Sequence, residues 1–151
     1  MKVLVATRNK DKFEIVKRMV EAIIPDALLI SVADVDISGD VVEVGTISER
    51  AVQKAQYFLE RLEWSKCADD FDAVLAVDDG LRIADGDATP NSKELTDRIL
   101  KEEWSPGEEI DVVRSFALIK RGERPRVELT SVPLYSSVTP CLFGGKQVSI
   151  L

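Results

Sequence analysis

The sequence contains no histidine, and this absence excludes more chemistry than any other feature of its composition. Catalytic triads built on histidine and zinc sites with histidine ligands are impossible. Only two cysteines are present, Cys67 and Cys141, without metal-ligand spacing, and we expect both to be reduced packing residues. If the chain is an enzyme, we therefore expect it to work with carboxylates, lysines and a hard metal ion such as Mg²⁺.

Long apolar runs are also missing from the sequence. No run approaches the roughly 20 residues that cross a bilayer, and polar residues follow the first short run too soon for a signal peptide. We therefore expect a cytoplasmic protein without a membrane partner. The net charge is −7, from 27 acidic and 20 basic residues. An acidic chain argues against binding to duplex nucleic acid, although clustered lysines would still suit a small phosphorylated ligand.

The 151 residues, of which 45% are hydrophobic, are enough for one domain with a real core. Without repeats or a linker, we expect a single domain over residues 1–151. The patterns predict strands at 2–6, 27–33, 73–77, 81–84, 111–119 and 126–137, an edge segment at 41–44, and helices at 11–24, 46–63 and 91–103. Strands and helices alternate first and antiparallel strands follow, which predicts an α/β fold with a mixed central sheet flanked by helices.

One buried strand is predicted to end in two carboxylates, Asp78 and Asp79, which precede Gly80. Ligands in open α/β sheets bind at the carboxyl ends of the strands. Two carboxylates at this edge could hold a hard cation or activate a water molecule. The alternative is an Asp-Gly turn whose acidic side chains are simply solvated.

Two other segments carry residues of matching chemistry. Thr7, Asn9 and Lys12 lie between the first strand and the first helix, where free backbone N–H groups and a lysine favour an anion. The glycines of a P-loop are missing, so an ordinary polar loop is an equally good interpretation. Glu43 precedes the second helix, and Lys54 lies within it. If these segments meet, carboxylates and lysines without histidine suit Mg²⁺-assisted hydrolysis of a phosphoanhydride.

Together, in order and spacing, these segments resemble the inosine triphosphate pyrophosphatase family of nucleotide hydrolases. Residues 6–12 resemble its Thr-x-Asn-x-x-Lys loop, and residues 43–45 its Glu-x-Gly pattern. Residues 49–55 resemble its Glu-Asn-Ala-x-x-Lys-Ala helix start, and residues 78–81 its Asp-Ser/Thr-Gly-Leu segment. Residues 114–118 are similar to its Arg-x-x-Phe strand. The resemblance covers roughly the first 120 residues.

The resemblance implies cleavage of a nucleoside triphosphate, usually one with a non-standard purine, to the monophosphate and pyrophosphate. It also implies Mg²⁺ (or Mn²⁺) dependence and a homodimer. By position, Glu43 and Asp78 would bind the metal, and Asp78 would orient or deprotonate the attacking water. The residues placed at the substrate are Thr7, Asn9, Lys12, Lys54 and Asp79.

Several positions depart from the family pattern. Asp79 replaces a serine or threonine and Arg50 an asparagine, while Ile15 stands where the family has a glutamate. The late Gly-Phe-Gly-Tyr-Asp-Pro segment and the closing Ser-His-Arg, which contact the base, are absent. The phosphate and metal half of the site is therefore matched and the base-reading half is not. The alternative function is a non-catalytic nucleotide-binding or protein-interaction module on the same scaffold.

Overall fold

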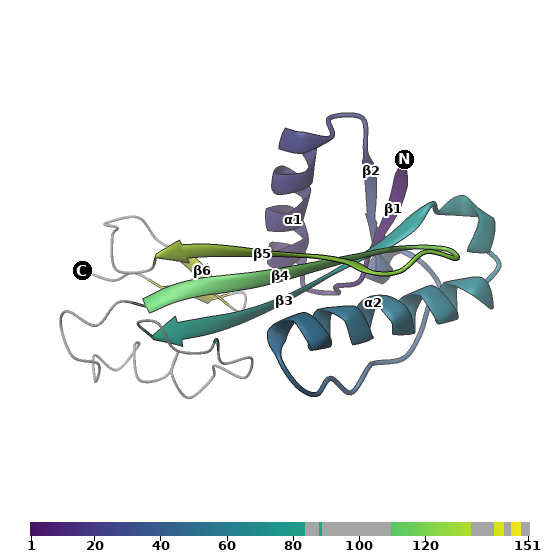
Figure 1. Cartoon of the computed structure of the whole chain (residues 1–151). Helices are drawn as coiled ribbons and strands as arrows, with labels where there is room; N and C mark the ends of the chain where they lie inside the picture. The colour runs from purple at the N-terminus through teal and green to yellow at the C-terminus, as the bar shows by residue number, and fades with distance from the viewer. Residues whose placement is uncertain (84–87, 89–109, 134–140, 144–145, 149–151) are drawn as a thin grey trace.

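The computed structural model describes residues 1–83, 88, 110–133, 141–143 and 146–148 (Figure 1). Within this part of the chain, neither α-helix is both long and apolar enough to cross a membrane. The elements in chain order are β1 (Lys2–Val5), α1 (Lys10–Ile23), β2 (Leu28–Ser31), η1 (Val32–Asp34), α2 (Ile47–Glu63), η2 (Ala68–Asp70), β3 (Ala73–Ile83), β4 (Ile110–Lys120), β5 (Arg126–Pro133), β6 (Cys141–Phe143) and β7 (Lys146–Val148), where η marks a 3₁₀-helix.

Five strands form a mixed sheet in the order β2-β1-β3-β4-β5. β1 runs parallel to both β2 and β3, whereas β3, β4 and β5 form antiparallel pairs. α1 and α2 cover opposite faces of this sheet (Figure 1). The prediction of an α/β fold with a mixed central sheet flanked by helices is confirmed. β6 and β7 form a separate antiparallel pair.

Alternation along β3 supplies the apolar side chains of both layers. Val74 and Ala76 belong to the core on the α2 side, and Leu75 and Val77 to the core on the α1 side. A strand covered on both faces needs apolar residues at every position rather than at alternate ones. This double burial explains the unbroken apolar run that ends at Val77.

The start of α2 is held by a capping box. The Thr46 hydroxyl accepts a hydrogen bond from the Glu49 backbone N–H (3.2 Å), and the Glu49 carboxylate accepts one from the Thr46 N–H (2.8 Å). Gly45 precedes the cap with a φ of +93°, and a Cβ there would collide with the Glu49 carboxylate. The backbone angle therefore favours glycine at this position, and a Cβ would also displace the carboxylate that completes the cap.

The expectation that one strand ends at the two aspartates is wrong. β3 continues through Asp78 and Asp79 to Ile83, because β4 pairs with it over its whole length. β1 pairs only with residues 73–75 of β3. The two aspartates therefore lie within β3 but beyond the carboxyl end of its parallel neighbour β1.

Other expectations differ in smaller ways. The segment 41–44 is not a strand; instead, the Gln53 side chain of α2 hydrogen-bonds both the N–H and the C=O of Val44, each at 2.9 Å. The strand expected at 27–33 ends at Ser31, whose hydroxyl caps the 3₁₀-helix that follows. The helix expected at 91–103 and the last residues of the strand expected at 126–137 lie outside the described residues.

Leu4 gives a test of how much the two-sided burial stabilises the fold. Its side chain is 0% exposed in β1, and we expect Leu4→Ala to lower the free energy of unfolding by about 2–5 kcal/mol because it leaves a cavity. Leu28→Ala is the matched control, since Leu28 is 56% exposed on the edge strand β2, and we expect a loss under about 1 kcal/mol. Urea unfolding measures both; equal losses would contradict the assignment of Leu4 to the core.

Candidate functional site

Asp78 and Asp79 point to opposite faces of the sheet, because successive side chains of a strand alternate. Asp78 faces α2 and lies 3.9 Å from the Lys54 ammonium, whereas Asp79 faces α1 and lies 3.3 Å from the Lys12 ammonium. Both side chains are about nine-tenths buried. The two neighbouring carboxylates therefore belong to two separate ion-pair clusters rather than to one acidic pair.

On the α2 side, Arg50 and Lys54 both bridge the carboxylates of Glu43 and Asp78. Arg50 Nε lies 3.0 Å from Asp78 Oδ2, and Arg50 Nη2 lies 3.4 Å from Glu43 Oε2. Lys54 Nζ lies 2.8 Å from Glu43 Oε1, closer than its distance to Asp78. Arg50 Nη1 also donates to the backbone carbonyl of Glu43 at 3.1 Å. The shared cations thus hold two partly buried carboxylates of distant sequence position beside each other.

On the α1 side, Asp79 is paired with two cations. Besides Lys12, Arg114 lies opposite Asp79 in β4, with its Nε 3.5 Å from Asp79 Oδ1. Oδ1 is buried and accepts no hydrogen bond from the described residues. Asp79 is therefore neutralised by charge rather than by a close hydrogen bond at this oxygen.

The loop between β1 and α1 is stabilised by hydrogen bonds that its own side chains accept. Asn9 caps α1 by accepting a hydrogen bond from the Lys12 N–H (3.0 Å), and the Thr7 hydroxyl accepts one from the Asn9 N–H (3.2 Å). Arg8 donates to the carbonyls of Ile37 (2.9 Å) and Gly39 (3.0 Å), which ties this loop to the segment before α2. The predicted strand-to-helix turn is present, with its side-chain oxygens used locally.

A cavity of about 260 Å³ opens where this loop faces the segment before α2. Thr7, Asn9, Glu43 and Lys54 are among the residues that line it. The volume lies slightly below the range of about 300–1,000 Å³ that is typical of small-molecule pockets. Four of the predicted site residues thus share one cavity, and Asp78 adjoins it through its contact with Lys54.

Burial raises the pKa of Asp78 above the ordinary value of 3.8. The Lys54 charge opposes this rise, the Glu43 carboxylate adds to it, and Lys12 and Arg50 oppose it more weakly. Lys12 therefore acts on Asp78 although it pairs with Asp79 on the other face. A carboxylate with a raised pKa is better suited to accept a proton, and such groups are frequent at functional sites.

Sequence reasoning missed the part played by Arg50 and Arg114. Arg50 precedes Lys54 by four residues, so both project from one side of α2. They flank the buried positions Ala51 and Ala55, and this pair of cations beside an apolar stripe is the signal that could have identified Arg50. Arg114 could not be found in this way, because its partner follows from the register of β4 against β3.

A divalent metal would have to be held by few protein ligands. Among the described residues, no three acidic, cysteine or histidine side chains are grouped closely enough to hold a metal ion. Glu43 and Asp78 still provide the oxygen donors that Mg²⁺ prefers, and Mg²⁺ is often bound by one or two carboxylates together with substrate phosphates. Their chemistry therefore fits the ion, although Arg50 and Lys54 pair with both carboxylates in this structure.

A scan against protein-family models found no match, and no curated protein matches the sequence. Solved structures do match the fold. A nucleoside-triphosphatase / dITP/XTP pyrophosphatase from Mycobacterium abscessus is 20% identical with a TM-score of 0.58, over 99% of this chain and 83% of that chain. A HAM1 protein from Coxiella burnetii is 18% identical with a TM-score of 0.64, over 99% and 81%. The Staphylococcus aureus Ham1 protein is 17% identical with a TM-score of 0.60, over 88% and 70%. The chain therefore has the fold of these proteins.

The raised pKa of Asp78 predicts how stability changes with pH. Because the folded state favours the protonated carboxyl group, stability present below pH 3.8 is lost as the pH rises through the folded pKa of Asp78. Asp78→Asn cannot ionise, so its stability relative to the wild type should rise over this window and level off above it.

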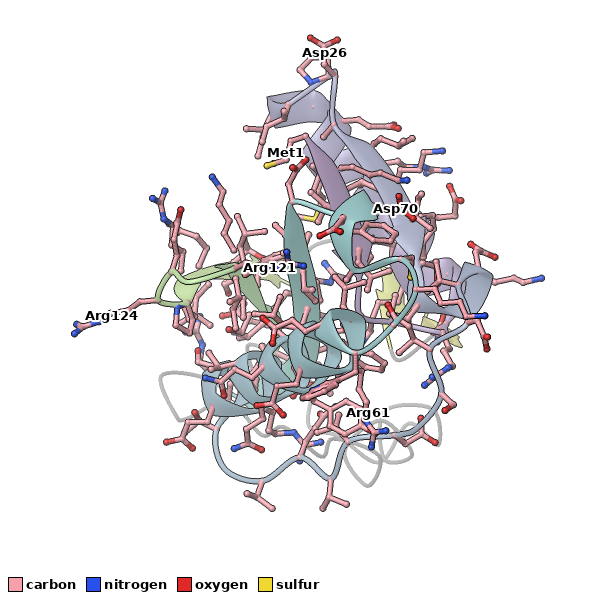
Figure 2. The ribbon with its side chains drawn as sticks, turned by 90° about the vertical axis from the view of Figure 1, so that its right-hand side faces the viewer. Met1, Asp26, Arg61, Asp70, Arg121 and Arg124 are labelled. Carbon is pink, nitrogen blue, oxygen red and sulfur yellow. The ribbon has the colours of Figure 1, made fainter. Side chains whose placement is uncertain are left out.

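Urea unfolding at a series of pH values measures the difference, and the Asp78 carboxyl ¹³C signal gives the titration directly. Asp26→Asn, on the exposed tip after α1 (Figure 2), shows the effect of removing one surface carboxylate. A relative stability of Asp78→Asn that falls as the pH rises would contradict the direction of the shift.

Proposed function

We propose that this chain is a divergent, Mg²⁺-dependent nucleoside triphosphate pyrophosphatase. Its substrate would be a nucleoside triphosphate, most naturally one with a non-standard purine, and its products the monophosphate and pyrophosphate. One observation carries the proposal: residues suited to phosphate, Thr7, Asn9 and Lys54, line the same cavity as Glu43, next to Asp78. The fold shared with Ham1 and dITP/XTP pyrophosphatase structures supports it.

Phosphate groups would bind at the loop and at the lysines. Free N–H groups at the start of α1 attract an anion, and the Thr7 and Asn9 side chains lie beside them at the cavity. Lys54 supplies a positive charge from α2, and Lys12 supplies one from the first turn of α1. These groups would fix the triphosphate with its reacting phosphorus toward Asp78.

Asp78 is the proposed general base. Its carboxylate would accept a proton from a water molecule while the water oxygen bonds to the α-phosphorus and the bond to the bridging oxygen breaks, releasing pyrophosphate. Burial raises its pKa, which strengthens it as a proton acceptor. Arg50, 3.0 Å away, would keep the carboxylate oriented before substrate arrives.

Glu43 and Asp78 are the proposed ligands of Mg²⁺ or Mn²⁺. When bound, the ion would supply charge neutralisation to the phosphate oxygens. Asp79 would affect substrate binding through Lys12. Its ion pair with Lys12 would limit how freely the lysine can reach a phosphate. The resemblance to the inosine triphosphate pyrophosphatase family also leads us to propose a cytoplasmic location and a homodimer. Sedimentation at several concentrations would test the homodimer.

A second candidate function is a non-catalytic nucleotide-binding module. The observation in its favour is that Arg50 and Lys54 already pair with both proposed metal ligands. Such a protein would be stabilised against heat by a nucleotide without forming product. Turnover of any nucleotide by the wild type removes this candidate.

A screen of standard and deaminated triphosphates with Mg²⁺ or Mn²⁺, read by pyrophosphate release, tests the function. We expect turnover of at least one nucleotide, and a loss of kcat of about 10²–10⁴-fold in Asp78→Asn because the proton acceptor is removed. Asp26→Asn, far out on an exposed tip (Figure 2), should retain activity. No pyrophosphate from any nucleotide with the folded wild type would sink the proposal.

Asp79→Ser tests the part played by the Lys12 ion pair. The substitution places a small hydroxyl in β3 and releases Lys12 from its 3.3 Å contact. With its charge free for a phosphate, we expect KM for the best nucleotide to fall by roughly three- to tenfold. Steady-state kinetics measure this, with a thermal melt to check the fold; an unchanged or higher KM would show that Asp79 does not restrain Lys12.

A further inference from the structure

Arg50 is placed on the two carboxylates that the proposed function assigns to the metal. Its guanidinium lies 3.0 Å from Asp78 and 3.4 Å from Glu43, and it donates to the Glu43 carbonyl at 3.1 Å. The three contacts use three different nitrogen atoms, Nε, Nη2 and Nη1. This rigid planar group thus matches the space between the carboxylates in a way that a point charge could not.

We propose that Arg50 is a built-in cation that competes with the divalent metal for Glu43 and Asp78, so that the metal binds only when the guanidinium moves away. The proposal rests on the proposed function, because it takes these carboxylates as the metal ligands. It makes the metal-free protein a self-neutralised state rather than one with two free acids.

Charge and burial both favour this competition. The Glu43 and Asp78 side chains are 12% and 9% exposed, so an unpaired charge on either would be poorly solvated. Arg50 removes that penalty in the metal-free protein, and a metal at the same oxygens would lie beside a like charge. Metal affinity should therefore be low for as long as Arg50 stays in place.

Lys54 does not play the same part. Its ammonium group lies 2.8 Å from Glu43 but 3.9 Å from Asp78, so Arg50 is the closer of these two cations to Asp78. Lys54 also lines the cavity. The guanidinium of Arg50 instead contacts the two carboxylates and the backbone carbonyl of Glu43. Lys54 therefore competes mainly at Glu43, whereas Arg50 pairs with Glu43 and also makes the close contact with Asp78, so the arginine is the competitor that acts at both ligands.

The triphosphate itself would release the guanidinium. The Arg50 side chain is 23% exposed and has a long flexible stem, so its guanidinium can move. A guanidinium group binds phosphate oxygens with two parallel hydrogen bonds, just as it binds a carboxylate. A nucleotide in the adjoining cavity would offer Arg50 new acceptors while metal takes over Glu43 and Asp78. Metal and nucleotide would then favour each other's binding, since such coupling is reciprocal.

Mn²⁺ binding to the full chain without nucleotide, followed by electron paramagnetic resonance, tests the proposal. We expect weak binding by the wild type and affinity higher by about tenfold or more in Arg50→Asn, because a like charge is removed from the ligands. Arg50→Lys keeps the charge but loses the planar guanidinium, so its gain in affinity should be smaller than that of Arg50→Asn.

Arg61→Asn is the matched control, because it removes an arginine from the same helix at the end that faces the viewer in Figure 2, where Arg61 stacks on the Tyr57 ring. It should leave Mn²⁺ affinity unchanged. Two results would overturn the proposal: an Arg50→Asn affinity within about twofold of the wild type, including no binding at all, or an equal gain in Arg61→Asn.

Circular dichroism checks that the variants fold. If they do not fold, nuclear magnetic resonance of the wild type tests the same proposal. The ¹⁵N signal of Arg50 Nε should shift as Mg²⁺ is added, because its contact with Asp78 is lost. Mg²⁺ binding without such a shift overturns the proposal. The failure of the pyrophosphatase function would be seen separately, as absent turnover in the nucleotide screen.

Discussion

The whole arrangement depends on the pairing of β3 with two neighbours of opposite direction. β1 pairs with it in parallel over three residues, and β4 pairs antiparallel over all eleven. This carries β3 past the end of β1, into the region where the loop before α1 and the segment before α2 approach. Strand alternation then directs Asp78 to one helix and Asp79 to the other. The geometry of the site is thus a consequence of the length of β3 and of the alternation of its side chains between the two faces of the sheet.

The carboxylates of the candidate site are neutralised by cations from within the chain. Among the described residues, the cations Lys12, Arg50, Lys54 and Arg114 face three carboxylates, so one positive charge remains in excess. Such a set is stable without a ligand, because each buried carboxylate has a partner. An anionic ligand would have to exchange partners with these carboxylates rather than enter an open positive cleft. The site is consequently one in which ligand binding and internal ion pairs compete.

Local features were predictable where their cause is local. The cap formed by Thr46 and Glu49 is of this kind, because it depends on only four successive residues. The apolar run before Asp78 correctly predicted a buried strand, and the structure covers it on both faces. The expected end of that strand was wrong, because an Asp-Gly sequence is a turn signal that the eleven-residue pairing with β4 overrides. The edge segment predicted at 41–44 is absent from the sheet, and nothing local in the sequence indicates that the Gln53 side chain hydrogen-bonds the backbone of Val44 instead.

The sequence by itself determined the fold class, the cap of α2 and the residue types of the candidate site, because periodicity, capping and chemical type depend on near neighbours in the chain. Through the family resemblance it also grouped Glu43, Lys54 and Asp78 as candidate site residues, and the structure brings their side chains together as ion pairs. Only the tertiary structure decided that Asp79 belongs with α1, and that the Arg50 guanidinium lies on both Glu43 and Asp78. These outcomes depend on strand register and on which helix covers which face, and both are set by contacts between residues far apart in the sequence.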